Sequence, residues 1–267
     1  MIGRRRLLSA LVAAAVGSAA APMALGATGQ ERKKTGRKLP WRNWSGSQRC
    51  VPDARKAPAS VAELQELVRS SEGVIRPVGA GHSFTALVPT DGTIVSLARM
   101  GGVVSHDPDA LQATVRAGTR LGELGQPLED IGQALINMPD IDEQTLAGCL
   151  GTATHGTGTG IGCMSTFVRG LQLMDASGEL IDCNAAQNRE LFEAAKVGLG
   201  SLGILTEVTL QNEAGYRLRR ETRWRSFDEI LEVADTEADQ HRNYEFFYVP
   251  FSGMGFTDAH DYTDEPI

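Results

Sequence analysis

The stretch that decides the fold is VIRPVGAGHSF, residues 74–84, in which a short apolar run ends in two glycines and a histidine. Gly79 and Gly81 carry no Cβ and can adopt positive φ, so consecutive backbone N–H groups can form a concave nest around a pyrophosphate. His82 follows this nest directly. The stretch lacks the third glycine of a Rossmann fingerprint and the Lys-Ser/Thr pair of a P-loop. It therefore predicts a dinucleotide loop of another kind, preceded by a strand over residues 73–78.

Two further glycine-rich segments lie downstream of this loop. Residues 145–160, TLAGCLGTATHGTGTG, combine small residues with hydroxyls, which lets backbone approach a flat ligand while the hydroxyls bond its polar edges. Residues 198–210, GLGSLGILTEVTL, form a turn and then alternate as a strand does. The three segments in this order are far more specific than any one of them alone.

Together the segments resemble the FAD-binding domain of the vanillyl-alcohol oxidase and p-cresol methylhydroxylase family over residues 40–213. Within that family, the aldonolactone oxidases (gulonolactone and arabinonolactone oxidases) and the alditol oxidases are most similar. The resemblance implies an α+β fold, with a two-subdomain FAD-binding domain of the p-cresol methylhydroxylase type at residues 30–213. The beginning of an incomplete α+β cap domain is expected at residues 214–267. The family's substrate-orienting groups lie mainly in the C-terminal part of the cap, so no catalytic base is nominated.

The resemblance also implies a set of cofactor-binding residues. FAD is the expected cofactor, and His82 is expected to bond covalently to the flavin 8α-methyl carbon. A neutral imidazole nitrogen is a suitable nucleophile near pH 7, and the alternative is an ordinary loop histidine bonded to a carbonyl. His155 either orders its loop beside the flavin or has a purely structural role. The residues expected to bind FAD are Pro77, Val78, Gly79, Ala80, Gly81, His82, Ser83, Asp140, Thr145, Gly148, Thr152, Ala153, Thr154, His155 and Ile204.

The activity implied by the resemblance is FAD-dependent oxidation of a hydroxyl-bearing carbon of a small sugar lactone, such as D-arabinono-1,4-lactone, or of a polyol. The flavin takes the hydride at N5 and passes electrons to oxygen or another acceptor. Pro139 stands where alditol oxidases carry a small residue beside the flavin, which leaves oxidase and dehydrogenase behaviour open. Two alternatives are a flavin reductase of the same fold and a flavin-binding module without catalysis.

Hydrophobic periodicity predicts the elements around these loops. Ser60 and Glu63 form a capping box at the start of a helix whose apolar stripe includes Leu64 and Val68. Further helices are predicted over residues 121–132, 188–195 and 226–239. Further strands are predicted over residues 93–97, 103–105, 112–116, 167–174, 180–182, 204–210, 217–225 and 244–250.

Charge and cysteine usage exclude several kinds of site. The net charge of −7 becomes −7 − 3 = −10 when residues 1–29, with three arginines and no acid, are left out. Such an acidic body opposes nucleic-acid binding. The four cysteines show neither a Cys-x-x-Cys pair nor zinc-ligand spacing, so no metal site is predicted. An exported protein could hold a disulfide, for which Cys149 and Cys163 are the first pair to test, but spacing does not establish proximity and buried free thiols are favoured.

The N-terminus is predicted to be an export signal at residues 1–29. Arg4, Arg5 and Arg6 precede an uncharged run that is rich in alanine and glycine. The Arg-Arg-x-Leu-Leu beginning resembles the twin-arginine type, which exports proteins already folded around their cofactors. The expected location is therefore periplasmic or extracellular. A membrane anchor is the alternative because the run approaches the length of a transmembrane helix.

Replacing the three arginines together (Arg4→Lys, Arg5→Lys and Arg6→Lys) is expected to leave the protein in the cytoplasm. The positive charge is kept, whereas the paired-arginine signal is lost. Cell fractionation and immunoblotting measure the distribution. A general secretory signal tolerates this change, so an unaltered exported yield would exclude the twin-arginine assignment and leave secretion itself intact.

Overall fold

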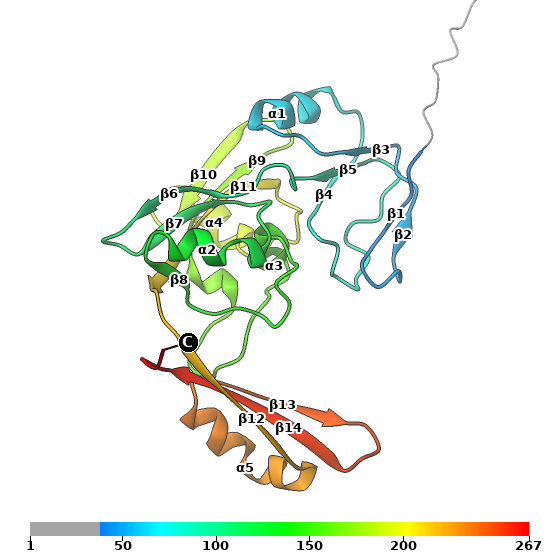
Figure 1. The fold of residues 1–267 in the computed structure, drawn as a ribbon. Helices are drawn as coiled ribbons and strands as arrows, with labels where there is room; N and C mark the ends of the chain where they lie inside the picture. The colour runs from blue at the N-terminus through cyan, green and yellow to red at the C-terminus, as the bar shows by residue number, and fades with distance from the viewer. Residues whose placement is uncertain (1–37, 267) are drawn as a thin grey trace, which may run out of the picture. The chain divides into compact units, whose positions relative to one another are not determined.

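The computed structural model describes residues 38–266, which belong to one compact unit, so the predicted export signal lies outside the described residues. Figure 1 shows the order of its helices and strands along the chain. In the part of the chain that the structure describes, no helix is both long enough and apolar enough to cross a membrane.

A small parallel sheet carries the loop that follows residue 78. Its strands pair in the order β3-β5-β4, and helix α1 lies between β3 and β4 in the sequence. These elements are β3 (Ala54–Lys56), α1 (Val61–Ser70), β4 (Ile75–Val78) and β5 (Thr93–Ser96). A two-stranded hairpin precedes them, with β1 (Trp41–Arg42) and β2 (Arg49–Cys50) antiparallel.

Helix α1 begins where the sequence predicts. The Ser60 hydroxyl accepts a hydrogen bond from the Glu63 amide at 3.1 Å. The Glu63 carboxylate accepts from the Ala59 amide at 2.8 Å, one residue earlier than in a standard capping box. Leu64 and Val68 are buried in one core cluster with residues of β5 and β9. The predicted helix start and apolar stripe are therefore confirmed.

A larger antiparallel sheet forms the second layer of strands, in the order β10-β9-β11-β7-β6, with β8 paired to the far end of β11. β11 alternates buried and partly exposed residues along almost its whole length, as a strand with one face on the core must. The strands are β6 (Val103–Asp107), β7 (Gln112–Arg116), β8 (Gln133–Leu135), β9 (Val168–Met174), β10 (Leu180–Asn184) and β11 (Ile204–Ala214).

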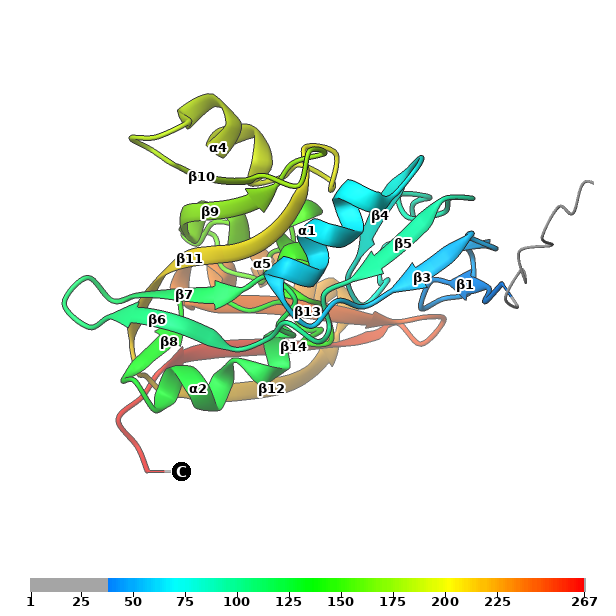
Figure 2. The ribbon, with the colours of Figure 1, turned by 90° about the horizontal axis from the view of Figure 1, so that it is seen from above.

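Short helices pack on this sheet and complete the main core. Leu121, Leu146, Leu150 and Phe192 come from three of them and are buried with Val208 of β11. Figure 2 shows α4 beside β10, with which it packs. The short helices are η1 (Leu121–Glu123), α2 (Gly125–Glu129), α3 (Leu146–Gly151), η2 (Met164–Phe167) and α4 (Arg189–Ala195).

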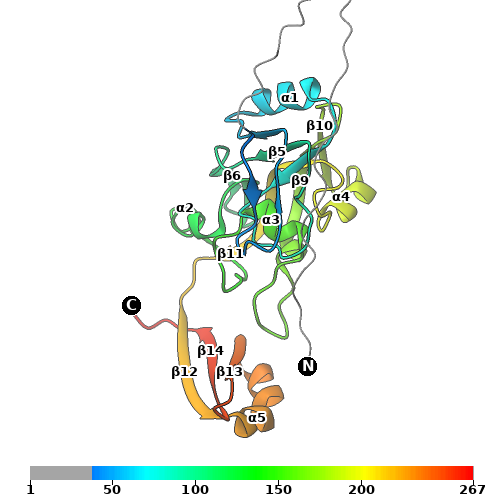
Figure 3. The same ribbon diagram turned by 90° about the vertical axis from the view of Figure 1, so that its right-hand side faces the viewer.

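The remaining strands form a third sheet of their own, in the order β12-β14-β13 and wholly antiparallel. Helix α5 packs along one face of this sheet, as Figures 1 and 3 show. Ser226 and Glu229 form a capping box at the start of α5. The Glu229 amide donates to the Ser226 hydroxyl, and the Ser226 amide donates to the Glu229 carboxylate. The elements are β12 (Leu218–Ser226), α5 (Phe227–Gln240), β13 (Asn243–Val249) and β14 (Met254–Tyr262). The domain boundary placed at residues 213 and 214 coincides with the end of β11 and stays a prediction.

Several features of the structure differ from the sequence analysis or were not predicted by it. The helix predicted over residues 121–132 is divided into η1 and α2, because Pro127 has no N–H with which to continue the helical ladder and two glycines flank the break. Helix α3 at the start of the 145–160 segment and the central strand β14 were not predicted. All four cysteines are free, as the favoured prediction of free thiols has it, and the candidate pair Cys149–Cys163 does not form a disulfide. The Cys149 thiol instead donates to the Leu146 carbonyl, and its burial raises its pKa to about 12.

The centre of β14 contains a buried carboxylate. Asp258 is 1% exposed and accepts hydrogen bonds from Arg220 and Thr222 of β12. The bond from Arg220 holds the pKa of Asp258 below its usual range, against the opposing effect of burial, and the Thr222 bond acts in the same direction as Arg220.

Asp258→Asn is therefore expected to lower the free energy of unfolding near pH 7 by about 1–3 kcal/mol. A carboxyl whose folded pKa is lowered stabilises the fold above its unfolded pKa, about 3.9, and loses this contribution as the pH falls through the folded value. Urea unfolding should thus show a full difference between wild type and variant near neutral pH that shrinks below about pH 4. Asp264→Asn, at an exposed position, is the control. A difference that does not change with pH would contradict the assignment.

Candidate cofactor site

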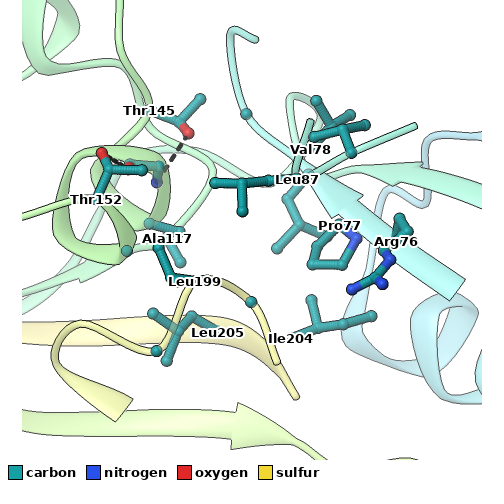
Figure 4. Close-up of a pocket in the computed structure, with 18 of the residues that line it drawn as sticks. Arg76, Pro77, Val78, Leu87, Ala117, Thr145, Thr152, Leu199, Ile204 and Leu205 are labelled. Carbon is teal, nitrogen blue, oxygen red and sulfur yellow. Dashed lines mark hydrogen bonds between the residues drawn. The ribbon is translucent and has the colours of Figure 1, made fainter. Parts of the chain in front are cut away.

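The three glycine-rich segments line one pocket of about 150 Å³. Most of its walls come from residues 76–83, 144–152 and 198–205, and apolar side chains of the neighbouring strands close it. Figure 4 shows Pro77 and Val78 on one side, Thr145 and Thr152 on the other, and Ile204 with its neighbours below. Segments separated by more than a hundred residues in the sequence therefore meet as the sequence predicts.

The first loop passes so close to α3 that only glycine fits at its centre. A Cβ on Gly79 would lie 2.1 Å from the Thr145 hydroxyl oxygen. That oxygen is itself fixed, because it accepts a hydrogen bond from the Gly148 amide at 3.3 Å and caps α3. Thr145 is buried. The first loop and the start of α3 thus form one wall with no room for a side chain between them.

Gly81 is required for a different reason. Its φ is +72°, in the left-handed region that favours glycine, whereas Gly79 does not have a positive φ. The Gly81 carbonyl accepts a hydrogen bond from the Trp44 amide at 2.9 Å. Positive φ at this residue turns the chain so that His82 and Ser83 also line the pocket.

The third segment enters the pocket through a run of positive φ angles. Leu199 and Gly200 have φ of +54° and +69°, and Gly203 has φ of +143°. A Cβ on Gly200 would lie 3.1 Å from Pro77 of β4, and one on Gly203 would lie 2.5 Å from the Met174 carbonyl oxygen. Positive φ is uncommon for a leucine, and such backbone strain often occurs at functional sites.

The structure places most of the residues expected to bind FAD in the pocket wall. The expected residues that line it are Pro77, Val78, Gly79, Ala80, Gly81, His82, Ser83, Thr145, Gly148, Thr152 and Ile204. Asp140, Ala153, Thr154 and His155 are not part of this lining. Thr154 lies behind the pocket wall. Its hydroxyl accepts a hydrogen bond at 3.2 Å from the side-chain amide of Gln144, and Gln144 lines the pocket.

Two of the expected residues lie on the surface. His155 is exposed, and its Nδ1 lies 2.8 Å from the Gly156 carbonyl oxygen. Asp140 is exposed near Glu245 of β13, whose pKa is raised first by burial and then by the Asp140 charge. Their roles toward the cofactor stay predictions.

Several lining residues carry no signal that the sequence analysis used. Leu87, Ala117, Leu173 and Leu199 are ordinary apolar residues that reach the pocket through tertiary contacts. Arg76 is the one lysine or arginine among the lining residues that the structure describes, and no aspartate or glutamate occurs among them. Arg76 could have been recognised from the sequence as a pocket residue, because it lies three residues before Gly79.

These residues fit a dinucleotide with a flat ring system. The bare backbone at residues 79–81 leaves its peptide groups uncovered by a Cβ at Gly79 and Gly81, and the Thr145 hydroxyl lies beside Gly79. Thr152 lines the same pocket. The walls are otherwise mainly apolar, as in most cofactor pockets. One cation without a neighbouring carboxylate suits a phosphate-bearing ligand.

Comparison with known proteins agrees with this fit. Residues 52–184 match the family model described as an FAD binding domain. This part of the chain belongs to that family. The predicted FAD-binding fold of the p-cresol methylhydroxylase type is confirmed. A solvent-stable cholesterol oxidase has the same fold, with a TM-score of 0.73, 22% identity and coverage of 85% of this chain and 48% of that chain.

The relatives of this FAD-binding chain include aldonolactone oxidoreductases. L-Gulono-1,4-lactone dehydrogenase of Mycobacterium tuberculosis is 34% identical over 84% of this chain and 53% of its own length. L-Gulonolactone oxidase of Bos taurus is 32% identical over 85% of this chain and 52% of its own length. The expected resemblance to aldonolactone oxidases is thereby confirmed. The chain spans about half the length of these curated relatives.

Gly79→Ala tests the contact that shapes the FAD-binding pocket. The new Cβ would overlap the Thr145 hydroxyl, and overpacking of this kind costs about 1–3 kcal/mol. We expect FAD to bind about five- to a hundredfold more weakly, as measured by equilibrium dialysis. Gly160→Ala is the matched control, because no atom lies within 4 Å of its Cβ position.

A double variant tests whether the overlap with the Thr145 hydroxyl causes the weaker binding of FAD. Combining Gly79→Ala with Thr145→Ala removes the overlapping oxygen and should recover part of the affinity, although α3 loses its cap. The overlap has no role in binding if Gly79→Ala and Gly160→Ala bind FAD equally well.

Proposed function

We propose that this protein is an FAD-dependent oxidoreductase that oxidises a hydroxyl-bearing carbon of an aldonolactone. The observation that carries the proposal is the convergence of three glycine-rich segments on one pocket around the Gly79–Thr145 contact. The names of two relatives, a gulonolactone oxidase and a gulonolactone dehydrogenase, support the lactone as substrate class. Bound FAD supplies a two-electron acceptor for the substrate hydride, and the protein residues hold and orient it.

Within this proposal, different residues of the pocket wall bind different parts of the cofactor. The backbone of residues 79–81 holds the pyrophosphate, and Arg76 adds a positive charge at the same wall. Thr145 and Thr152 offer hydroxyls from the two ends of α3. Ile204 and Leu199 pack against apolar parts of the ligand.

His82 is proposed as the covalent attachment point. It lies directly after the phosphate loop and lines the pocket. His82 would supply the imidazole nitrogen that takes the place of one 8α-methyl hydrogen of a bound flavin. That hydrogen would leave as a proton, and oxygen would take up the two electrons of the broken C–H bond.

The electron acceptor in turnover and the location complete the proposal. The two relatives are named as an oxidase and a dehydrogenase, so oxygen and another small-molecule acceptor are both considered. Pro139 is partly exposed next to Asp140 and is the residue whose replacement would test access of oxygen. Export to the periplasm or the medium is proposed from the sequence at residues 1–29.

Anaerobic mixing of the FAD-loaded protein with candidate reductants tests the activity. We expect L-gulono-1,4-lactone or D-arabinono-1,4-lactone to bleach the yellow absorbance of oxidised flavin, followed by stopped-flow spectroscopy, and polyols to do so less. Admitting oxygen or an artificial acceptor should restore the colour. Bleaching by NADPH instead of lactones would establish a reductase. A flavin that no lactone, polyol or NADPH bleaches would establish a binding module.

A further inference from the structure

The hairpin of β1 and β2 lies against the segment that carries His82, about 40 residues further along the chain. Its two strands pair only through Trp41 with Cys50 and Arg42 with Arg49, and a turn joins them. A hairpin this short is not stable by itself, so its contacts with the rest of the protein hold it in place. Those contacts are concentrated at residues 81–84.

Asn43 anchors the turn to the backbone beside His82. It is only 2% exposed, and its amide group donates to the Ser83 carbonyl at 2.9 Å. Its side-chain oxygen accepts from the Gln48 amide at 3.0 Å, which closes the turn. On the other side of His82, the Gly81 carbonyl accepts from the Trp44 amide at 2.9 Å. The carbonyl groups of the residues before and after His82 are therefore bonded to this turn.

The Trp44 indole then covers the His82 ring itself. The two ring centroids are 5.2 Å apart and the planes differ by 17°, which is a stacked pair. Phe84 meets the indole edge at 6.3 Å and an interplanar angle of 90°. Trp44 is nevertheless 67% exposed, so burial of the indole in a core does not explain its position. The indole stacks on the His82 imidazole and meets Phe84 only at an edge-to-face contact.

We propose that Trp44 is a positioning residue for covalent attachment of the flavin at His82. The bonds from the hairpin fix the His82 backbone, and the stack fixes the plane of its ring, so that one nitrogen is presented to the pocket before the bond forms. Once a ring nitrogen is bonded to carbon and the other keeps its proton, the imidazole is a cation. An indole face stabilises such a cation. This inference rests on the proposed covalent link and gives the link its geometry.

The experiment measures covalent incorporation apart from turnover. Full-length protein made in riboflavin-starved cells is mixed with FAD and oxygen, samples are denatured with acid, and in-gel flavin fluorescence gives the rate. Wild type is compared with Trp44→Phe, Trp44→Leu, Trp44→Ala and His82→Ala. Trp224→Ala is the control, because Trp224 is similarly exposed, at 65%, on β12. Reversible FAD affinity is measured at early times for every variant.

We expect Trp44→Ala and Trp44→Leu to slow covalent incorporation by roughly two- to tenfold while binding FAD as tightly as wild type. Trp44→Phe should keep most of the rate, because it restores an aromatic face. Leucine fills space without such a face, so it separates stacking from packing even if alanine impairs the fold. Equal rates for the leucine and phenylalanine variants would overturn the role of Trp44.

The outcome for wild type separates this inference from the proposed attachment. Covalent flavin in wild type and its absence in His82→Ala support the link itself. If wild type also releases all its flavin on denaturation, the proposed link is wrong and the role of Trp44 falls with it. If wild type is covalently labelled and all the Trp44 variants match Trp224→Ala, only the role of Trp44 is overturned.

Discussion

The contact between Gly79 and Thr145 is the constraint on which the cofactor pocket depends. It brings the end of β4 in the parallel sheet against the first residue of α3 with no side chain between them. The start of α3 is in turn held by backbone bonds from Leu146 to the Thr119 carbonyl and from Ala147 to the Ala117 carbonyl. The loop at residues 79–83 is thus tied to the chain that continues from β7. A substitution that separates Gly79 from Thr145 separates the two halves of the pocket.

Two other glycines bring the same parts of the chain together. A Cβ on Gly118 would lie 2.1 Å from the Leu97 carbonyl oxygen, so the chain after β5 and the chain after β7 touch through bare backbone. Gly200 similarly lies over Pro77, which connects β4 to the turn before β11. Gly79, Gly118 and Gly200 thus provide close approach between segments. Close packing of backbone leaves a pocket whose walls are rigid before the ligand arrives, which lowers the entropic cost of binding.

Elements with a strong local pattern could be predicted from the sequence, and those that depend on distant partners could not. α1, α5 and β11 have caps or regular alternation within one segment. β14 has Asp258 at its centre, which reads as a surface residue until Arg220 and Thr222 of β12 are placed beside it. α3 has six residues, two of them glycine, and is stabilised by burial rather than by helix propensity.

The same distinction applies to the site. Gly79, Gly81 and Thr145 could be identified because small residues and hydroxyls in such loops have a direct physical meaning. Trp44 could not be given a role, since its relation to His82 requires a hairpin that folds back over about 40 residues. The sequence could not decide whether Cys149 and Cys163 pair, because spacing says nothing about where two thiols point, and both are free.

Polar contacts join the third sheet to the chain at Ile136 and at Thr157, on either side of α3 in the sequence. Arg242 bonds the Ile136 carbonyl and pairs with Glu213 at 3.0 Å, and its guanidinium lies over the rings of Tyr216 and Tyr262. Asn243, next to it, donates to the Thr157 carbonyl at 2.7 Å. A planar guanidinium held at its edges and on its faces has one favourable orientation, unlike a lysine at the same place. Because these bonds are directional, they fix how β13 meets the loop that contains Pro139 and Asp140. In the proposed function Pro139 of that loop is the residue that tests access of oxygen, so the same arginine connects the third sheet to that test.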